Sequence, residues 1–347
     1  MKRGFKFMAK VMVFLLLFAI LLTGFVIVSR KNNQAKIEGE KIEYKNHPKL
    51  AEVVSLSPEN IGRIKKKFIG KSIRGMHHIP NEILHKGVVI TFGGSEGSIN
   101  EHMAEYLTSA GYEVVSVYYF GQKDQPQSGE SIGIELYEEI YSYIKENCVN
   151  TDTITILGTS KGAQLALLIS TYYDSVDNLI LIAPSAYINP AVKLGENSSW
   201  TYYGEEIEYL NGRTIKPVIM TIVNTILNKP QDQLVYMNAV ANKSTNLEEA
   251  RIKAEESNAR MLIFYGGDDR MIDAKSASYI IKEYANKEVT IHGYENAGHS
   301  FGSSSVITHD DNIFMNILSG GDIDSNIEAD LDSKRVILET LEKWHKL

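Results

Sequence analysis

The sequence predicts an α/β fold with a mostly parallel central sheet and helices on both faces. Short apolar runs of strand length alternate with longer stretches of helical periodicity, which is the pattern of strand-helix-strand units. Several of the short runs are unbroken and rich in Val and Ile, as in parallel strands that helices cover on both faces. The strands are expected over residues 88–92, 114–120, 154–157, 179–183, 261–265 and 289–294.

Helices are expected between these strands. In 131–147 apolar residues recur every four positions, which predicts an amphipathic helix. Similar spacing predicts helices over 163–170, 274–284 and 334–347. The stretch 185–259 interrupts the alternation and is rich in Tyr and Asn, so we expect it to form a cap. Such a cap would cover the carboxyl edge of the sheet, where open α/β sheets bind ligands.

The composition is that of a globular protein and excludes several other classes. Of the 347 residues, 44% are hydrophobic and 23% are charged, which excludes a disordered or collagen-like chain. Cys148 is the only cysteine, so no disulfide can form within the chain. The net charge of −7 and the pI near 5.8 argue against nucleic acid as a partner.

The N-terminal segment 1–31 is expected to be a membrane anchor. Residues 11–28 are apolar apart from Thr23 and Gly24, and as a helix they would span roughly 27 Å, close to the thickness of a hydrocarbon core. The residues that end this run are bulky and offer no small-residue cleavage site, which favours an uncleaved anchor over a cleaved signal peptide. Basic residues that favour a cytoplasmic N-terminus precede the run at Lys2, Arg3, Lys6 and Lys10.

The rest of the chain is expected to work outside the cytoplasm, as part of a single-pass protein of the cell membrane. Residues 32–70 are polar and rich in lysine, which predicts a linker, and 71–347 are predicted to be the α/β domain. Segment 1–31 holds six basic residues and no acidic one, so the remainder carries a formal charge of −13. This charge argues against a polyanionic partner for the domain.

Ser160 is the candidate nucleophile. It stands at the centre of the motif Gly158-Thr159-Ser160-Lys161-Gly162, directly after a predicted strand and at the start of a predicted helix. A serine on so tight a turn has strained backbone angles, and glycines two residues away avoid collisions around it. The N–H groups at the start of the helix can stabilise an oxyanion beside the serine.

A candidate acid and a candidate base follow at the ends of two later strands. A serine nucleophile needs a base, and the base needs an acid that orients it. The strand at 261–265 is followed by Asp268 and Asp269, of which we favour Asp269 as the acid and the other as a turn or helix-capping residue. His299 follows the strand at 289–294 and is the candidate base. The order serine, acid, histidine is that of α/β-hydrolases.

Two backbone donors are expected to form an oxyanion hole. The first is the N–H of Lys161, the residue after the nucleophile. The second comes in this fold from the loop after the third strand. That loop is the glycine-rich segment 93–97, in which Gly94 or Ser95 is the candidate donor. The alternative interpretation of this loop is a simple turn.

No metal and no organic cofactor is expected from the sequence. His292 lies inside a predicted strand, and His77 and His78 precede the predicted sheet without a partner at metal-ligand spacing. His309 stands before two aspartates and is expected on the surface.

Segment 320–333 is similar to a calcium-binding loop at Asp322, Asp324 and Asn326. It lacks the central glycine of such a loop, and Ser333 stands where the bidentate acid belongs. We therefore interpret this segment as an acidic, solvated loop.

Seven motifs of the chain match one known family together. They are ITFGGSEG at 90–97, YYFG at 118–121, ILGTSKGAQLALL at 156–168, IAPSAYI at 182–188, SSWTYYGEEIEYL at 198–210, GGDD at 266–269 and NAGH at 296–299. Together they resemble the α/β-hydrolase domain of the acyl-CoA thioester hydrolase and bile-acid-CoA:amino acid N-acyltransferase family. The resemblance covers most of residues 85–305 and implies a bacterial, membrane-anchored member of this family.

The resemblance also implies a reaction. Ser160 would attack an acyl carbonyl, His299 would take and return the proton with Asp269 as the acid, and water would release the acid from an acyl-enzyme. The implied substrate is a small-molecule acyl thioester of the acyl-CoA kind, or a carboxylic ester. Acyltransferase members of the family use a cysteine nucleophile, so the serine at position 160 points to hydrolysis. The alternatives are an acyltransferase that passes the acyl group to an amine or alcohol, and a non-catalytic binding protein with the hydrolase fold.

Overall fold

An eight-stranded sheet forms the centre of the computed structural model, which describes residues 2–49, 65–70, 73–191, 197–213, 216–229, 233–301 and 319–346. In spatial order its strands are β1 (Lys65–Gly70), β2 (Arg74–Ile79), β4 (Glu113–Tyr118), β3 (Val88–Phe92), β6 (Ile154–Thr159), β7 (Asn178–Ile182), β10 (Arg260–Gly266) and β11 (Val289–Tyr294). Strand β2 pairs antiparallel with β1 and β4, and all the other pairs are parallel. The predicted fold class is confirmed.

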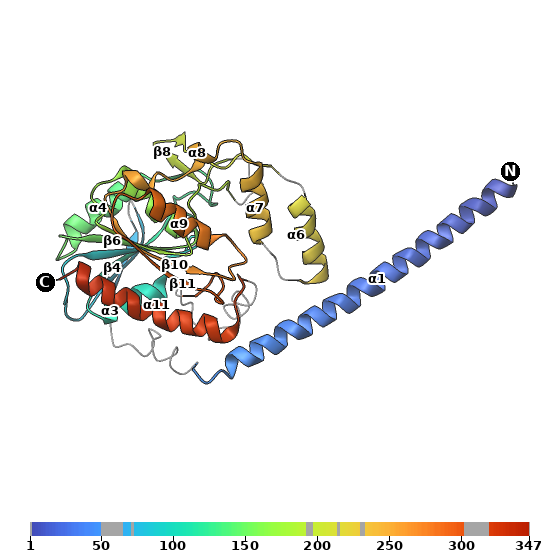
Figure 1. The fold of residues 1–347 in the computed structure, drawn as a ribbon, viewed down its shortest axis with the longest axis horizontal. Coiled ribbons are helices and arrows are strands. Elements are labelled where there is room, and N and C mark those ends of the chain that lie inside the picture. Colours follow the sequence, from blue (N-terminus) through green and yellow to red (C-terminus); the bar gives the residue numbers. More distant parts are fainter. Residues whose placement is uncertain are drawn as a thin grey trace.

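Helices cover both faces of this sheet (Figure 1). One face packs against α4 (Leu136–Asn147), α5 (Lys161–Tyr172) and α9 (Ala274–Tyr284), and the other against α3 (Glu101–Ser109) and α11 (Ile323–Trp344). Every residue of β3 and β7 is buried between these layers, which explains why their sequences are almost entirely apolar.

The segment predicted as the cap contains several short elements. Strands β8 (Trp200–Tyr202) and β9 (Glu205–Glu206) join β5 (Ile132–Gly133) in a small second sheet. The helices that follow are α6 (Lys216–Leu227), α7 (Gln233–Lys243), α8 (Leu247–Ala250) and the 3-10 helix η1 (Ala254–Glu256). Figure 1 shows α7 and α6 on the side of the sheet from which α1 projects.

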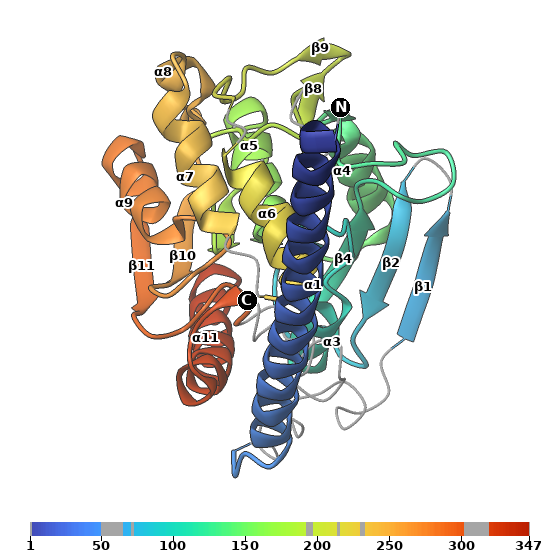
Figure 2. The same ribbon diagram turned by 90° about the vertical axis from the view of Figure 1, so that its right-hand side faces the viewer.

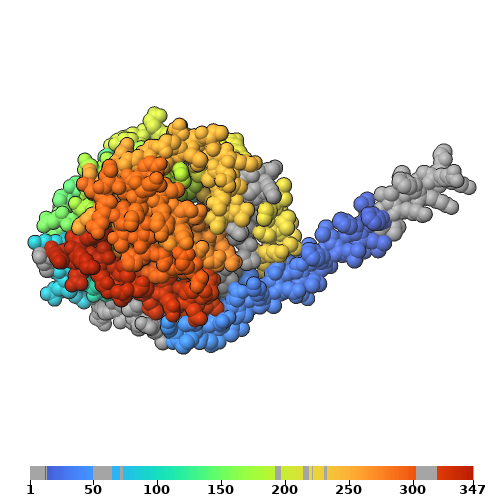
Figure 3. Space-filling model, in the orientation of Figure 1, coloured from blue at the N-terminus to red at the C-terminus, as the bar shows by residue number. Residues whose placement is uncertain are grey.

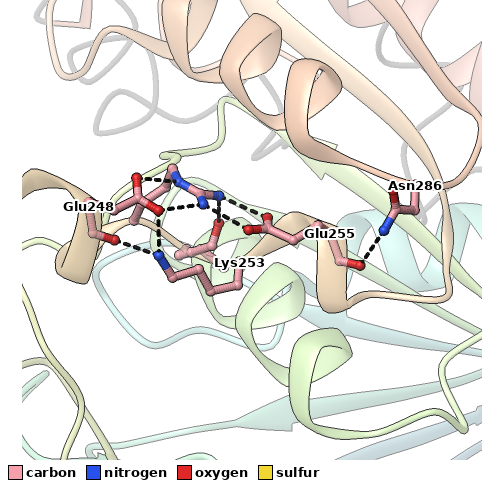
Figure 4. A network of polar contacts seen from close by, with 6 residues as sticks. Glu248, Lys253, Glu255 and Asn286 are labelled. Carbon is pink, nitrogen blue, oxygen red and sulfur yellow. Dashed lines mark hydrogen bonds and ion pairs between the residues drawn. The ribbon is translucent and has the colours of Figure 1, made fainter.

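Arg251 fastens the end of the cap to the sheet domain. Its buried guanidinium donates to Glu248 at 2.7 Å and to Glu255 at 2.8 Å, and it lies 3.7 Å from the ring centre of Tyr284 at the end of α9. Asn286 Nδ2 donates to the carbonyl of Glu255 at 2.9 Å. Figure 4 shows Glu248, Glu255 and Asn286 in this network. Because a buried guanidinium needs its ionic partners, this end of the cap is held firmly.

Helix α1 (Lys2–Lys45) projects far from the rest of the molecule (Figures 1 and 3). Its segment Phe14–Lys45 contains an 18-residue window with a mean hydropathy of 2.0, none of which is buried. The helix is thus long and apolar enough to cross a membrane, a property that signal sequences share.

The region expected to be a linker, 32–70, holds regular structure at both of its ends. Helix α1 continues through it to Lys45, and Ile37 and Tyr44 are buried against the domain. At the other end, β1 is the edge strand of the sheet. The lysines of β1 face water, which is typical of edge strands and explains why an apolar pattern did not reveal it.

The expectation of a solvated loop at 320–333 is wrong, because this segment is the beginning of α11. Asp322 caps the helix by accepting from Ser325 N at 2.8 Å. The helix was hidden because polar residues occupy core-facing positions: Asn326 is buried and accepts from Gly298 N at 2.7 Å. Asp330 and Lys334 form a buried pair at 2.7 Å one turn later.

Candidate active site

Ser160 lies in a strained backbone conformation at the turn between β6 and α5. Its φ and ψ angles are 54° and −115°, a region that residues other than glycine rarely adopt. Strand β6 ends at Thr159 and α5 begins at Lys161, so Ser160 alone connects them. Its N–H donates to the carbonyl of Ile182 on β7 at 2.8 Å, which fixes the turn to the sheet.

Gly158 and Gly162 allow this turn to close. A Cβ atom at Gly158 would lie 2.2 Å from the carbonyl oxygen of Gly162, and one at Gly162 would lie 2.1 Å from that of Gly93. Both distances are far shorter than a carbon–oxygen contact allows. The two glycines therefore permit the sharp strand-to-helix turn and bring the loop after β3 against the start of α5.

His299 lies between Ser160 and Asp269. Its Nε2 is 2.8 Å from Ser160 Oγ, and its Nδ1 is 2.7 Å from Asp269 Oδ2. Both His299 and Asp269 are buried, with exposed fractions of 8% and 4%. The structure thus brings together three side chains that the sequence places after three different strands, and it buries the acid and the base.

The two neighbouring aspartates have different surroundings. Asp269 Oδ1 accepts from the N–H groups of Met271 at 2.7 Å and Ile272 at 3.0 Å, which leaves its other oxygen directed at the histidine. Asp268 is exposed and accepts instead from Gly321 N at 2.8 Å. Of the two candidates for the acid, Asp269 is the one that contacts His299.

The glycine-rich loop after β3 offers one of its two candidate N–H donors. Gly94 N donates to the Glu96 carboxylate at 2.9 Å, and Ser98 Oγ donates to the same carboxylate at 2.5 Å. Within the described part of the chain, the N–H of Ser95 has no acceptor. The N–H of Lys161 stands in the first turn of α5, where no acceptor exists within the helix.

Tyr119 supports this loop and was not predicted as a site residue. It follows β4, it is buried, and its hydroxyl donates to the carbonyl of Gly94. Burial raises the pKa of Tyr119 well above its usual value, so this hydroxyl stays a donor. The available signal was the YYFG motif at 118–121, which nothing in the periodicity connects to the loop.

The side chain of Lys161 points away from the β6–α5 turn and contacts residues of the cap. Its Nζ donates to Ser199 Oγ and lies 5.1 Å from the ring centre of Trp200. Desolvation by burial lowers the pKa of Lys161 to about 7. Trp200 Nε1 donates in turn to Gln164 Oε1 on α5 at 2.7 Å. Two of the sequence motifs, SKG and SSWTY, are therefore in contact with each other.

His77 and His78 lie on β2 inside the sheet, so the expectation that they precede it is wrong. His77 Nε2 is 2.9 Å from Glu113 Oε1 and 3.6 Å from Cys148 Sγ, and the three ligand atoms lie within 4.8 Å of one another. These side chains could hold a metal ion, although burial and the nearby Glu113 raise the pKa of the Cys148 thiol. His77, Glu113 and Cys148 are far apart in the sequence, so their spacing along the chain does not reveal this cluster.

Another histidine, His292, forms no hydrogen bond with Ser160 or Asp269 among the described residues. It lies inside β11, as expected, and its ring is 5.5 Å from that of Phe264. His309 lies outside the residues that the structure describes.

One family model matches most of the sheet domain and the cap. Residues 132–344 match the family described as BAAT / acyl-CoA thioester hydrolase C terminal. The chain belongs to this family. The match covers more than half of the chain and confirms the resemblance that the motifs indicate.

Curated relatives of the family are similar over part of their length. Mouse acyl-coenzyme A thioesterase 1 is 26% identical over 210 residues, which are 60% of this chain and 45% of the relative. A mouse protein named acyl-coenzyme A amino acid N-acyltransferase 1 is 20% identical over 265 residues, which are 72% of this chain and 59% of that protein. The chain thus spans about half the length of the curated relatives it matches.

A solved structure shares the fold with this family member. The hyperthermophilic esterase from the archaeon Pyrobaculum calidifontis superposes with a TM-score of 0.51 at 16% identity, over 91% of this chain and 97% of the esterase. At this identity the similarity shows the fold alone, which is that of the α/β-hydrolases.

Proposed function

We propose that this family member is a membrane-anchored serine acyl hydrolase, with Ser160 as nucleophile, His299 as base and Asp269 as acid. The observation that carries the proposal is the continuous hydrogen-bonded chain from Ser160 Oγ through His299 to Asp269 Oδ2, with distances of 2.8 and 2.7 Å. Such a chain activates a hydroxyl that is otherwise a weak nucleophile at neutral pH.

The proposed reaction has two halves that use the same histidine. His299 Nε2 takes the proton of Ser160 Oγ as this oxygen attacks the acyl carbonyl, and Asp269 stabilises the imidazolium. The histidine then protonates the leaving thiolate or alkoxide, and an acyl-enzyme is left. Water then attacks the ester carbonyl while His299 takes its proton, and His299 returns this proton to Ser160 Oγ as the C–Oγ bond breaks and the carboxylic acid departs.

Backbone N–H groups at two places would stabilise the oxyanion. The N–H of Lys161 belongs to the first turn of α5, and that of Ser95 lies in the loop that Tyr119 supports. Gly94 can take this role only if its bond to the Glu96 carboxylate is given up. Donors fixed by the backbone stabilise a developing negative charge without reorganising.

The proposed substrate is a small acyl thioester or carboxylic ester. The names of the curated relatives refer to acyl-coenzyme A, which supports a thioester. A second candidate function is acyl transfer to an amine, because one relative that matches 72% of this chain is named as an N-acyltransferase. In both cases the acyl-enzyme on Ser160 is the common intermediate.

Turnover of two matched substrates by the full chain tests the proposal. The chain is purified in a mild detergent, and hydrolysis of decanoyl-CoA is compared with that of p-nitrophenyl decanoate. Ser160→Ala is expected to lower the rate at least about 10³-fold with the preferred substrate, and Ser109→Ala on α3 is the matched control. Activity that persists in Ser160→Ala would contradict the proposal.

The same assay distinguishes the alternatives. Preference for the thioester identifies a thioesterase, and preference for the ester identifies a carboxylesterase. If added glycine turns the product from free decanoic acid into decanoylglycine, acyl transfer is the function. If neither substrate shows Ser160-dependent turnover, the proposed hydrolysis fails, and the result favours a binding protein with the hydrolase fold.

A further inference from the structure

Helix α6 exposes an apolar stripe to the outside of the molecule. Its side chains at positions i, i+3, i+4 and i+7 have exposed fractions of 53%, 54%, 45% and 46%, and they are Ile219, Ile222, Val223 and Ile226. Side chains with this spacing share one helix face. In a helix of a water-soluble domain this face would be directed at the core, so the exposed apolar face of α6 calls for a partner outside the domain.

The sequence of α6 is suited to an apolar medium along its whole length. Residues 217–228 contain no charged side chain, while a lysine stands at each side of them, at positions 216 and 229. Lys229 is exposed. An apolar stripe between basic ends is the composition of helices that lie in the boundary between lipid headgroups and acyl chains.

Helix α6 is bound to α1 directly beyond the apolar span. Asn33 Nδ2 donates to the carbonyl of Leu227 at 2.8 Å, and Asn228 Nδ2 donates to Gln34 Oε1 at 2.8 Å. Asn33 follows Val28 by five residues, which is roughly 8 Å along a helix. If residues 11–28 cross the hydrocarbon core, these bonds hold the end of α6 at the depth of the headgroups.

A second attachment fixes the domain relative to α1. Asn326 Nδ2 on α11 donates to the hydroxyl of Tyr44 at 3.0 Å, and Tyr44 is buried. Helix α1 is thus held by α6 at one level and by α11 farther from the span. Figures 1 and 2 both show α6 beside α1 on the side of the domain from which α1 projects.

The same end of the α6–α7 pair, where α6 ends and α7 begins, also reaches the loop that carries the candidate acid. Leu234 N, at the start of α7, donates to the carbonyl of Arg270 at 2.8 Å. Arg270 directly follows Asp269, whose carboxylate contacts His299. Leu234 follows Asn228, which is bound to α1, by only six positions in the sequence. The cap therefore connects the membrane side of the molecule with the loop that carries the candidate acid.

We propose that α6 lies in the surface of the bilayer that α1 crosses, and that the enzyme takes its acyl substrate from this bilayer. The inference rests on the proposed function for both the anchor and the hydrolase chemistry. It narrows the substrate class to acyl esters or thioesters whose chains are dissolved in the membrane. The apolar face of α6 gains lipid as its partner, and the cap stands between that lipid and Ser160.

Quenching by lipid tests the position of α6 without any activity measurement. The native cysteine is removed by Cys148→Ser, and a bimane label is placed through Ile222→Cys in the full chain. The protein is reconstituted in vesicles of phosphatidylcholine and phosphatidylglycerol that contain phosphatidylcholine with a doxyl group on acyl carbon 5. We expect at least a twofold loss of fluorescence relative to vesicles without doxyl lipid.

Val149→Cys is the matched control for this experiment. Val149 is an exposed apolar residue, and its N–H donates to Glu113 at the beginning of β4, on the sheet edge opposite to Ser160. A label there should keep its fluorescence. Equal fluorescence with and without doxyl lipid at position 222 would overturn the proposal, and so would equal quenching at both positions. Protection of position 222 by a second copy or another protein would give the first of these results.

The source of the substrate is tested by comparing two esters. We expect the double variant Ile222→Glu/Ile226→Glu to lower the ratio of turnover of 4-methylumbelliferyl palmitate in vesicles to turnover of soluble 4-methylumbelliferyl butyrate about tenfold. An unchanged ratio would overturn the proposal that the substrate comes from the bilayer. If the variant is inactive with both esters, the quenching experiment alone decides whether α6 lies in the bilayer surface. If wild type hydrolyses neither ester through Ser160, the proposed function fails, while the quenching still reports the position of α6.

Discussion

Helices α9 and α6 have the same apolar spacing and opposite surroundings. In α9 the positions i, i+3, i+4 and i+7 are Ala274, Ala277, Ser278 and Ile281, and all of them are buried against the sheet. In α6 the corresponding stripe, from Ile219 to Ile226, is exposed. The two helices have 11 and 12 residues, so length does not separate them.

The comparison shows that the spacing of apolar residues identifies the apolar face of a helix. It does not show whether that face packs against the protein core, a lipid surface or another protein. The stripe of α9 is small and mixed, with alanine and serine that allow close packing on the sheet. The stripe of α6 consists of large aliphatic side chains, and the residues between its members are uncharged. Large apolar side chains that no described part of the chain covers indicate a second phase or a partner.

The largest difference in stability is expected between two variants that each place one aspartate on the stripe of one helix. Ile281→Asp should lower the free energy of unfolding by about 3–5 kcal/mol, because it buries an unpaired carboxylate and removes a core side chain. Ile222→Asp should cost about 1 kcal/mol or less, because its site is exposed. Urea unfolding of the detergent-solubilised full chain, followed by circular dichroism, measures both. Similar costs for the two variants would show that α6 packs as α9 does.

A smaller loss of stability at acidic pH is expected to come from His345 in the sheet domain. Burial lowers the pKa of His345 to about 4, whereas the unfolded chain has the ordinary value of 6.5. Between these values the unfolded chain binds more protons, so stability falls as the pH falls from 6.5 to 4. Residues 217–227 of α6 contain no titratable group, so this dependence on pH cannot come from the exposed stripe.

The variant His345→Gln isolates this contribution, since an amide can still reach Thr155, which lies 2.7 Å from His345 Nε2. Between pH 7 and 4.5 it should lose about 2 kcal/mol less stability than wild type. Urea midpoints at several pH values provide the measurement. Parallel pH curves for wild type and variant would mean that His345 keeps an ordinary pKa in the fold.

An effect on catalysis alone is expected at the loop after β3. Tyr119→Phe removes the hydroxyl that donates to the Gly94 carbonyl and should lower kcat about tenfold, or about 1.4 kcal/mol, with little change in KM. Tyr118→Phe is the adjacent control. The soluble ester is the substrate in this experiment, so that the rate does not depend on delivery of substrate from the membrane past α6. A change in KM without a change in kcat would mean that this loop binds substrate and does not stabilise the transition state.

The smallest effect is expected at the beginning of α9. Asp273 caps this helix by accepting from Ser276 N at 3.0 Å. Asp273→Ala should therefore lower stability by about 1 kcal/mol, and Glu283→Ala on the exposed side of α9 should change it by less than about 0.5 kcal/mol. Urea midpoints distinguish the two. Equal midpoints would show that the cap contributes nothing to this helix.

The fold was predictable because its central strands are local apolar runs. Strands β3 and β11 begin and end at the predicted residues, and so does α9. Edge and polar elements were missed: β1 contains three successive lysines, and the first half of α11 places Asn326 and Asp330 toward the core. Helix α1 continues past the predicted apolar run to Lys45, and near its end the hydroxyl of Tyr44 accepts from Asn326.

The candidate site was predictable to the extent that it lies at strand ends. Parallel strands end at the same edge, so Ser160, Asp269 and His299 could be expected near one another, and their catalytic roles stay a prediction. Tyr119 and the contact of Lys161 with Trp200 depend on packing between distant segments, which no local spacing encodes. The exposed face of α6 was not predicted, because the sequence does not show which side of a helix the chain covers.

Covalent labelling by a fluorophosphonate tests the central claim most directly. This reagent phosphonylates a serine that a neighbouring base activates. The full chain in detergent should gain one phosphonyl group, which peptide mass spectrometry locates on Ser160. Ser160→Ala should gain none, and His299→Ala should react at least about 10²-fold more slowly. Absence of labelling in wild type, or a label on another residue that persists in Ser160→Ala, would contradict the account.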